Sequence, residues 1–184
     1  LLSKEKNITA DICPGYLGLS IERLQFIKDA FNKKNIHVKV VILARDPISR
    51  IKSAVNFMIS KKKKNQGIEN YNQDFLKILS EYSKNEHCIY RTNYICAIEN
   101  AKAVFRDEDI YIGIYEKMFL ENEVENLSAF LGIQANRDFG KKIVHKTKSK
   151  KVSAEYDDEI RRFYDELYRY FNENYPDTLK LWSK

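Results

Sequence analysis

The pattern of apolar and polar positions along the chain predicts an α/β protein with more helix than strand. Three short runs of mostly apolar residues are predicted strands, at 7–12, 38–44 and 109–118. The middle run, VKVVILA, is almost wholly apolar, which is typical of a strand buried on both faces of a parallel sheet. Residues 20–34 have helical periodicity with Ser20 as the N-cap. Strand, helix and strand in this order predict a right-handed βαβ unit.

Five further helices are predicted from apolar residues that recur every three or four positions. One follows Pro47, two carry Phe75 and Tyr94, one covers 122–132, and the last ends before Pro176. The core-facing residues of the first and last of these helices are Ile48, Ile51, Val55, Met58, Ile59, Ile160, Phe163, Leu167 and Phe171. Because no internal repeat interrupts this order, residues 1–184 are predicted to form a single domain.

Composition and charge narrow the classes of function. The net charge is +6, which favours an anionic partner such as a nucleotide, an acidic glycan or nucleic acid. The three cysteines form no CxxC pair and no metal-ligand spacing, so we expect reduced thiols, a cytoplasmic setting and no bound metal. No run of about 18 apolar residues occurs, so no membrane span is expected.

The end of the apolar strand carries the most informative polar residues. Arg45 follows the strand directly, at the end where open parallel sheets bind their ligands. Asp46 can cap the next helix, and the N–H groups of that helix's first turn attract anions. Ser49 and Ser53 are four residues apart and share a helix face. An arginine and hydroxyls in this arrangement can hold a phosphate, or Arg45 can pair with a nearby carboxylate.

The segment RDPISRIKS, at 45–53, resembles the 3′-phosphate-binding motif of the sulfotransferases that use 3′-phosphoadenosine 5′-phosphosulfate (PAPS). The pattern of that motif is R-x-P-x-x-R-x-x-S. The resemblance implies that Arg45 and Ser53 hold the 3′-phosphate of the nucleotide. Arg50 matches the second arginine of the motif and is expected to belong to the same nucleotide site.

Three further stretches resemble the family in the expected order. ITADICPGY is similar to the segment GE-[K/I]-T-P-x-Y of bacterial and carbohydrate-type members. The stretch from RTNYI to AFLGI, 91–133, resembles the family region that ends in Y-E-x-L and FLG. KIVHKTKSKK lies where the family has a basic loop. The resemblance covers nearly the whole chain and implies a P-loop-like three-layer fold with a small parallel sheet between helices.

The resemblance also implies roles for individual residues. Aligned on Pro14, Asp11 takes the place of the family's catalytic glutamate and would deprotonate the acceptor; alternatively it caps a turn. Lys146 and Lys148 would cover the nucleotide or form a solvated loop. Glu116 matches a family glutamate and is expected to be structural. The implied donor is PAPS, the implied product is adenosine 3′,5′-bisphosphate, and no metal is implied.

The chain departs from the family at its start. Members begin with a strand and a loop, G-x-x-[RK]-[SC]-G-[ST], that wraps the 5′-phosphosulfate, and no such sequence occurs here. The chain therefore resembles the C-terminal two-thirds of the family domain. We expect a sulfotransferase acting on a hydroxyl of a saccharide or small molecule, in the cytoplasm or, for a eukaryotic carbohydrate-type enzyme, the Golgi lumen. The alternatives are a non-catalytic nucleotide-binding or scaffold relative, and a nucleic-acid-binding domain, which the core spacing of the aromatic residues disfavours.

Overall fold

The centre of the fold is a parallel sheet of two strands, β1 (Val40–Ala44) and β2 (Ile110–Ile114). The computed structural model describes residues 8–66, 71–120, 122–136, 138 and 154–183. The two strands pair in register from Val40 opposite Ile110 to Ala44 opposite Ile114. Their carboxyl ends therefore lie side by side, and the residues that follow them meet at one edge of the sheet.

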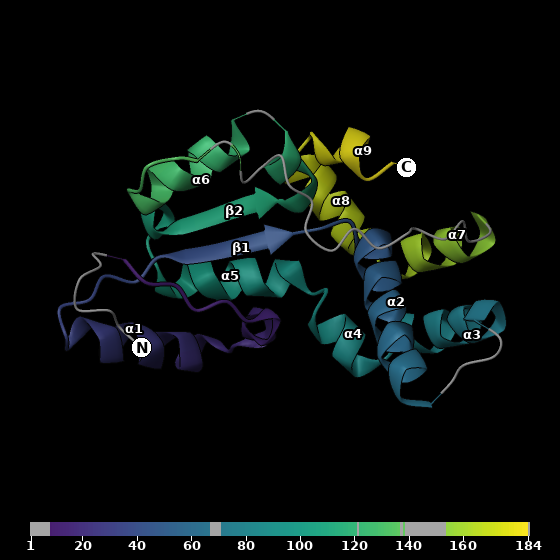
Figure 1. Cartoon of the computed structure of the whole chain (residues 1–184). Coiled ribbons are helices and arrows are strands. Elements are labelled where there is room, and N and C mark those ends of the chain that lie inside the picture. The colour runs from purple at the N-terminus through teal and green to yellow at the C-terminus, as the bar shows by residue number, and fades with distance from the viewer. Residues whose placement is uncertain (1–7, 67–70, 121, 137, 139–153, 184) are drawn as a thin grey trace.

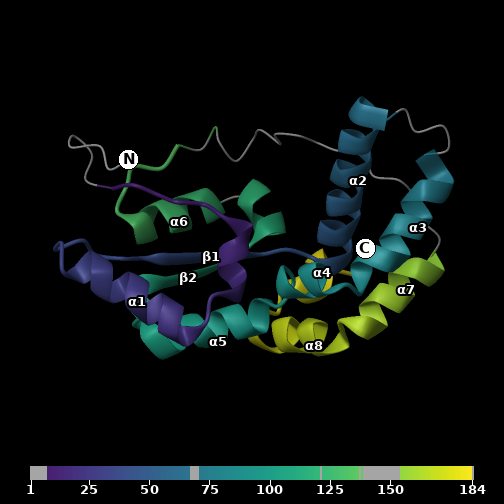
Figure 2. The ribbon, with the colours of Figure 1, turned by 90° about the horizontal axis from the view of Figure 1, so that it is seen from below.

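Helices flank the sheet on both faces (Figure 1). Helix α6 lies on one face, and α5 and α1 lie on the other; α2, α3, α4 and α7 pack beyond the carboxyl ends of the strands (Figures 1 and 2). The helical elements are η1 (Pro14–Gly18), α1 (Ile21–Asn32), α2 (Pro47–Gln66), α3 (Tyr71–Ser83), α4 (Glu86–Tyr90), α5 (Tyr94–Val104), η2 (Asp107–Asp109), η3 (Tyr115–Phe119), α6 (Glu123–Leu131), α7 (Ala154–Phe163), α8 (Asp165–Asn174) and α9 (Thr178–Leu181).

The helix-rich α/β architecture is confirmed, and the junction after β1 is built as its sequence predicts. The predicted core face of α2 is buried along most of its length, with Ile51, Val55 and Ile59 fully enclosed. Ser20 caps α1, since its hydroxyl accepts a hydrogen bond from the backbone N–H of Arg23 at 3.3 Å. This helix buries no residue completely, so its apolar stripe is only half covered.

Two predicted elements are wrong. The described part of the predicted strand at 7–12 is exposed and irregular. Strand β1 instead pairs with β2, and the connection between them contains α2, α3, α4 and α5. A strand in a parallel sheet needs a neighbouring strand to hydrogen-bond with along its length. Strand β2 is apolar and pairs with all five residues of β1. The predicted last helix is two helices, α7 and α8, which break at Tyr164.

The break in the C-terminal helix follows from how Tyr164 is bound. Its hydroxyl donates to the backbone oxygen of Ser83 at 2.8 Å, which ties the break to the end of α3. Phe163, predicted to face the core, is consequently 46% exposed. Among the described residues, no helix has both the length and the apolar character that a membrane span requires.

Candidate functional site

Arg45 stands at the carboxyl end of β1 with its charge unpaired by any described carboxylate. Its guanidinium lies over the ring of Tyr115, 4.6 Å from the ring centre, in a cation–π contact. The Nε atom of Arg45 is buried, and no described group accepts a hydrogen bond from it. The structure therefore shows an arginine with free donors, and the alternative that Arg45 pairs with a nearby carboxylate is wrong within the described chain.

Two carboxylates, the buried Asp46 and the half-buried Glu116, lie at this edge of the sheet with Arg45. Asp46 Oδ1 accepts a hydrogen bond from the hydroxyl of Tyr168 at 2.6 Å, and Oδ2 accepts from the backbone N–H of Ser49 at 2.9 Å. Glu116 Oε1 accepts from the N–H of Asp46 at 3.2 Å, and Oε2 accepts from Nε1 of Trp182 at 2.9 Å. Each of the four carboxylate oxygens thus has a protein donor.

The first turn of α2 has one of its N–H groups, that of Ser49, bound within the protein, so it offers fewer free donors to an anion than the sequence alone predicts. Asp46 caps the helix as predicted, through the N–H of Ser49. Because Asp46 occupies this N–H, and because a second carboxylate, Glu116, lies at this helix end, we expect side chains to make the main contacts with any anion here.

The electrostatics of the junction follow from its burial. Burial raises the pKa of Glu116 above its usual range, and the neighbouring charge of Asp46 raises it further, while the hydrogen bonds that Glu116 accepts oppose the shift. Burial raises the pKa of Tyr94 to about 12, although the nearby charge of Arg50 opposes the shift. Tyr94, which is buried at the start of α5, therefore stays neutral.

Arg50 turns away from the edge of the sheet and into the helical part of the molecule. Its Nη2 donates to the hydroxyl of Thr92 at 2.6 Å and contacts the sulfur of Cys88 at 2.9 Å. These contacts join α2 to α4 and to the residues that lead into α5. The nucleotide-binding role expected for Arg50 stays a prediction, and its present contacts fix the direction of α2.

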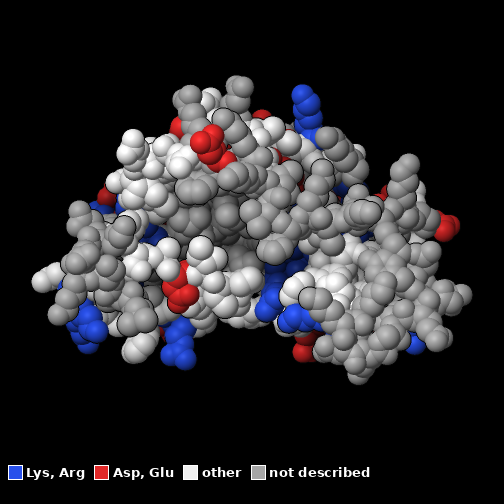
Figure 3. All heavy atoms as spheres, viewed as in Figure 1, with Lys and Arg blue, Asp and Glu red and all other residues white. Residues whose placement is uncertain are grey.

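Ser53 lies on α2, half-buried, and no described group is hydrogen-bonded to its hydroxyl. Its neighbour Lys52 is bound to Asp157 of α7 at 2.7 Å. Figure 3 shows Lys and Arg atoms near the middle of this face of the molecule. Arg45 and Ser53 thus retain unused hydrogen-bonding capacity, and so does Arg50, whose buried Nε has no acceptor among the described residues.

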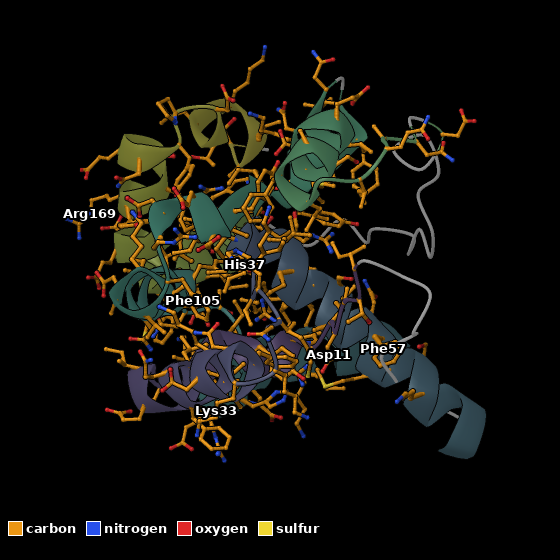
Figure 4. The ribbon with its side chains drawn as sticks, turned by 90° about the vertical axis from the view of Figure 1, so that its left-hand side faces the viewer. Asp11, Lys33, His37, Phe57, Phe105 and Arg169 are labelled. Atoms are coloured by element: carbon orange, nitrogen blue, oxygen red, sulfur yellow. The ribbon has the colours of Figure 1, made fainter. Side chains whose placement is uncertain are left out.

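Asp11 lies on the exposed segment before η1 (Figure 4). Its carboxylate accepts a hydrogen bond of 2.5 Å from the hydroxyl of Tyr16, and this bond is the main reason that the pKa of Tyr16 is raised. The segment is attached to α4, because the hydroxyl of Tyr90 donates to the oxygen of Gly15 at 2.9 Å. Gly18 permits this approach, since a Cβ there would meet the Tyr90 ring at 1.8 Å.

Lys146 and Lys148, the other predicted nucleotide ligands, lie outside the described residues. Within the described ranges, no group of three or more His, Cys, Asp or Glu side chains is placed to hold a metal ion. Sequence reasoning missed Tyr16, Tyr115 and Tyr168. Tyr115 could have been found from the pairing of the strands, because the residues after two parallel strands meet at one edge of the sheet.

Comparison with known families agrees with this geometry. A family model described as the sulfotransferase domain matches residues 23–169. No curated protein and no solved structure matches the chain. The matched range contains Arg45, Arg50 and Ser53, whereas Asp11 lies before it. Because the match covers well over half of the 184 residues, the chain belongs to the sulfotransferase domain family.

Proposed function

We propose that this protein is a sulfotransferase that takes its sulfuryl group from PAPS and transfers it to a hydroxyl of a saccharide or small molecule. The unpaired guanidinium of Arg45 carries the proposal. A buried arginine donor without an acceptor has a cost in free energy, which an anionic ligand would remove. In this proposal, Arg45 and Ser53 bind the 3′-phosphate of the donor.

In the proposed reaction, Asp11 removes the proton from the acceptor hydroxyl as its oxygen attacks the sulfur. The new oxygen–sulfur bond forms while the bond between sulfur and the phosphate oxygen breaks. The products are the sulfate ester and adenosine 3′,5′-bisphosphate, and the proton is left on Asp11. The hydrogen bond from Tyr16 holds the carboxylate of Asp11 in one orientation.

Nucleotide binding tests the proposed site directly. Calorimetric titration of the chain should show tighter binding of adenosine 3′,5′-bisphosphate than of adenosine 5′-phosphate, because only the first carries a 3′-phosphate. Replacing Arg45 with Ala should remove about 2 kcal/mol of that preference, the value of hydrogen bonds to charged groups. Ser53→Ala should remove a smaller part.

A matched control is Arg106→Ala, because Arg106 is an arginine already paired with carboxylates at the other end of the sheet. This variant should keep the full preference for the bisphosphate. Equal affinities for the two nucleotides in the unchanged protein, or an unchanged preference in Arg45→Ala, would contradict the proposed 3′-phosphate site.

The base is tested by sulfate transfer. Asp11→Asn keeps the hydrogen bond from Tyr16 possible but removes the proton acceptor, so the transfer rate should fall about 100-fold or more. Nucleotide affinity should stay unchanged in this variant. Full transfer activity would assign the base to another residue, while nucleotide binding without any transfer in the unchanged protein would favour a non-catalytic relative.

A further inference from the structure

Arg45 is unpaired although two carboxylates, the buried Asp46 and the half-buried Glu116, stand at the same edge of the sheet. Asp46 follows it in the chain, and Glu116 follows Tyr115, whose ring the Arg45 guanidinium covers. A guanidinium and a carboxylate at such an edge ordinarily form a bidentate pair, since both charges are partly removed from water. Some feature of the junction must therefore keep the two carboxylates from binding Arg45.

The hydrogen bonds to the carboxylates supply that feature. The Trp182 indole N–H donates a hydrogen bond to Glu116 Oε2, and the Tyr168 hydroxyl donates one to Asp46 Oδ1. The other two oxygens are bound to backbone N–H groups of the junction itself. Trp182 and Tyr168 are thus the only described side chains that donate to these two carboxylates, and both come from the C-terminal helices.

Arg161 holds these two aromatic residues in place. Its Nη2 donates to the backbone oxygen of Trp182 at 2.8 Å, and its guanidinium lies over the ring of Tyr168, 4.4 Å from the ring centre. The two rings also pack against each other edge to face, with centres 5.9 Å apart. The positions of both donors are therefore fixed by contacts that do not involve the carboxylates.

We propose that Trp182 and Tyr168 are positioning residues that occupy Glu116 and Asp46 and so keep Arg45 free to bind an anion. The proposal rests on the proposed role of Arg45 in binding the 3′-phosphate. It gives the C-terminal residues a part in ligand binding although they touch no nucleotide. If Trp182 loses its N–H, Glu116 has a free oxygen at the edge of the sheet where Arg45 stands without an ion pair to any described carboxylate.

The test compares the preference for adenosine 3′,5′-bisphosphate over adenosine 5′-phosphate in a set of variants. Trp182→Phe keeps a ring but removes the N–H, so the preference should fall about tenfold, which corresponds to one charge-assisted hydrogen bond. Adding Glu116→Gln removes the competing charge, so the double variant should recover most of the preference. If Trp182 only stabilises the core, the double variant should instead lose more of the preference than Trp182→Phe, because a second substitution at the same contact would weaken the core further.

A second variant covers the case in which Trp182→Phe does not fold. Tyr168→Phe removes the donor to Asp46 and should lower the preference in the same direction. The matched control is Tyr111→Phe, which removes a similar bond from an aromatic donor to a buried glutamate, Glu123, at 2.6 Å. That control should lose stability but keep the full preference for the bisphosphate.

The outcomes separate the two proposals. If Arg45→Ala leaves the preference unchanged, the proposed 3′-phosphate site is wrong. If Arg45→Ala lowers it while Trp182→Phe and Tyr168→Phe do not, the site stands and the positioning role is wrong. Recovery in the Trp182→Phe/Glu116→Gln double variant supports the positioning role, and further loss in that variant overturns it.

Discussion

Arg106 and Arg45 stand at opposite ends of the same two-stranded sheet and differ in what binds their charge. At the amino end, Arg106 pairs with Asp109 at 3.0 Å and with Glu108 at 2.7 Å. His37 adds a contact of 2.5 Å to the same Asp109, so that an imidazole and a guanidinium share one carboxylate. At the carboxyl end, Arg45 stacks on Tyr115 and has no described carboxylate partner.

The carboxylates at the two ends, the buried Asp109 and the half-buried Glu116, also differ in their pKa shifts. Burial raises the pKa of Asp109, but the hydrogen bonds from His37 and Arg106 outweigh it, so that the pKa is lowered. The pKa of Glu116 is raised, because burial and the charge of Asp46 outweigh the bonds that Glu116 accepts. The amino end thus uses the charge of Arg106 to stabilise the fold, whereas the carboxyl end keeps the charge of Arg45 available at some cost in stability.

The largest effect is expected from Asp109→Asn, which removes the carboxylate that binds His37 and Arg106 at the amino end of the sheet. The change removes the negative charge that binds His37 and Arg106, so it should lower the free energy of unfolding by about 2 kcal/mol. Thermal unfolding should show a melting temperature lower by about 5 °C for a chain of this size. The bisphosphate preference should stay the same. If Asp109→Asn lost the preference for the bisphosphate but kept its stability, the roles assigned to the two ends of the sheet would be wrong.

The sequence predicts the carboxyl end better than the amino end. Arg45, Asp46 and Pro47 form a local unit whose strand end, cap and helix start depend only on neighbouring residues. The cluster at the amino end joins His37 with Asp109, 72 residues later. Such a pair depends on strand register, which a single sequence does not provide.

The same limit explains the missed partners of the junction. Trp182 and Tyr168 are both buried, but their polar atoms bind Glu116 and Asp46, which lie 66 and 122 residues away in the sequence. Periodicity locates a buried ring and says nothing about which way its N–H or O–H points. The strand predicted at 7–12 failed for a related reason, because a short run shows alternation without showing a pairing partner.

A smaller effect is expected from Arg45→Lys, which sharpens the comparison at the carboxyl end. Lysine keeps the charge but loses the planar fork that stacks on Tyr115, so the bisphosphate preference should fall about tenfold. Stability should change little, because Arg45 forms no ion pair with a described carboxylate. Arg106→Lys is the matched control and should keep the preference. Equal preferences in both lysine variants would show that the stacked geometry at Arg45 is irrelevant to binding.

The smallest effect is the response of the two ends to acid, which should have opposite signs. The folded pKa of Glu116 is raised above 4.5, so acidification towards pH 4.5 protonates it in the fold and increases stability. The folded pKa of Asp109 lies below 3.8, so its contribution is intact above pH 3.8 and is lost as the pH falls through the folded value. Urea unfolding at stepped pH would measure both windows. Glu116→Gln should remove the gain in stability on acidification towards pH 4.5, and Asp109→Asn should remove the loss of stability below pH 3.8. If both variants show the same dependence of stability on pH as the unchanged protein, the assignment is wrong, because each carboxylate would then bind protons equally well in the folded and unfolded states.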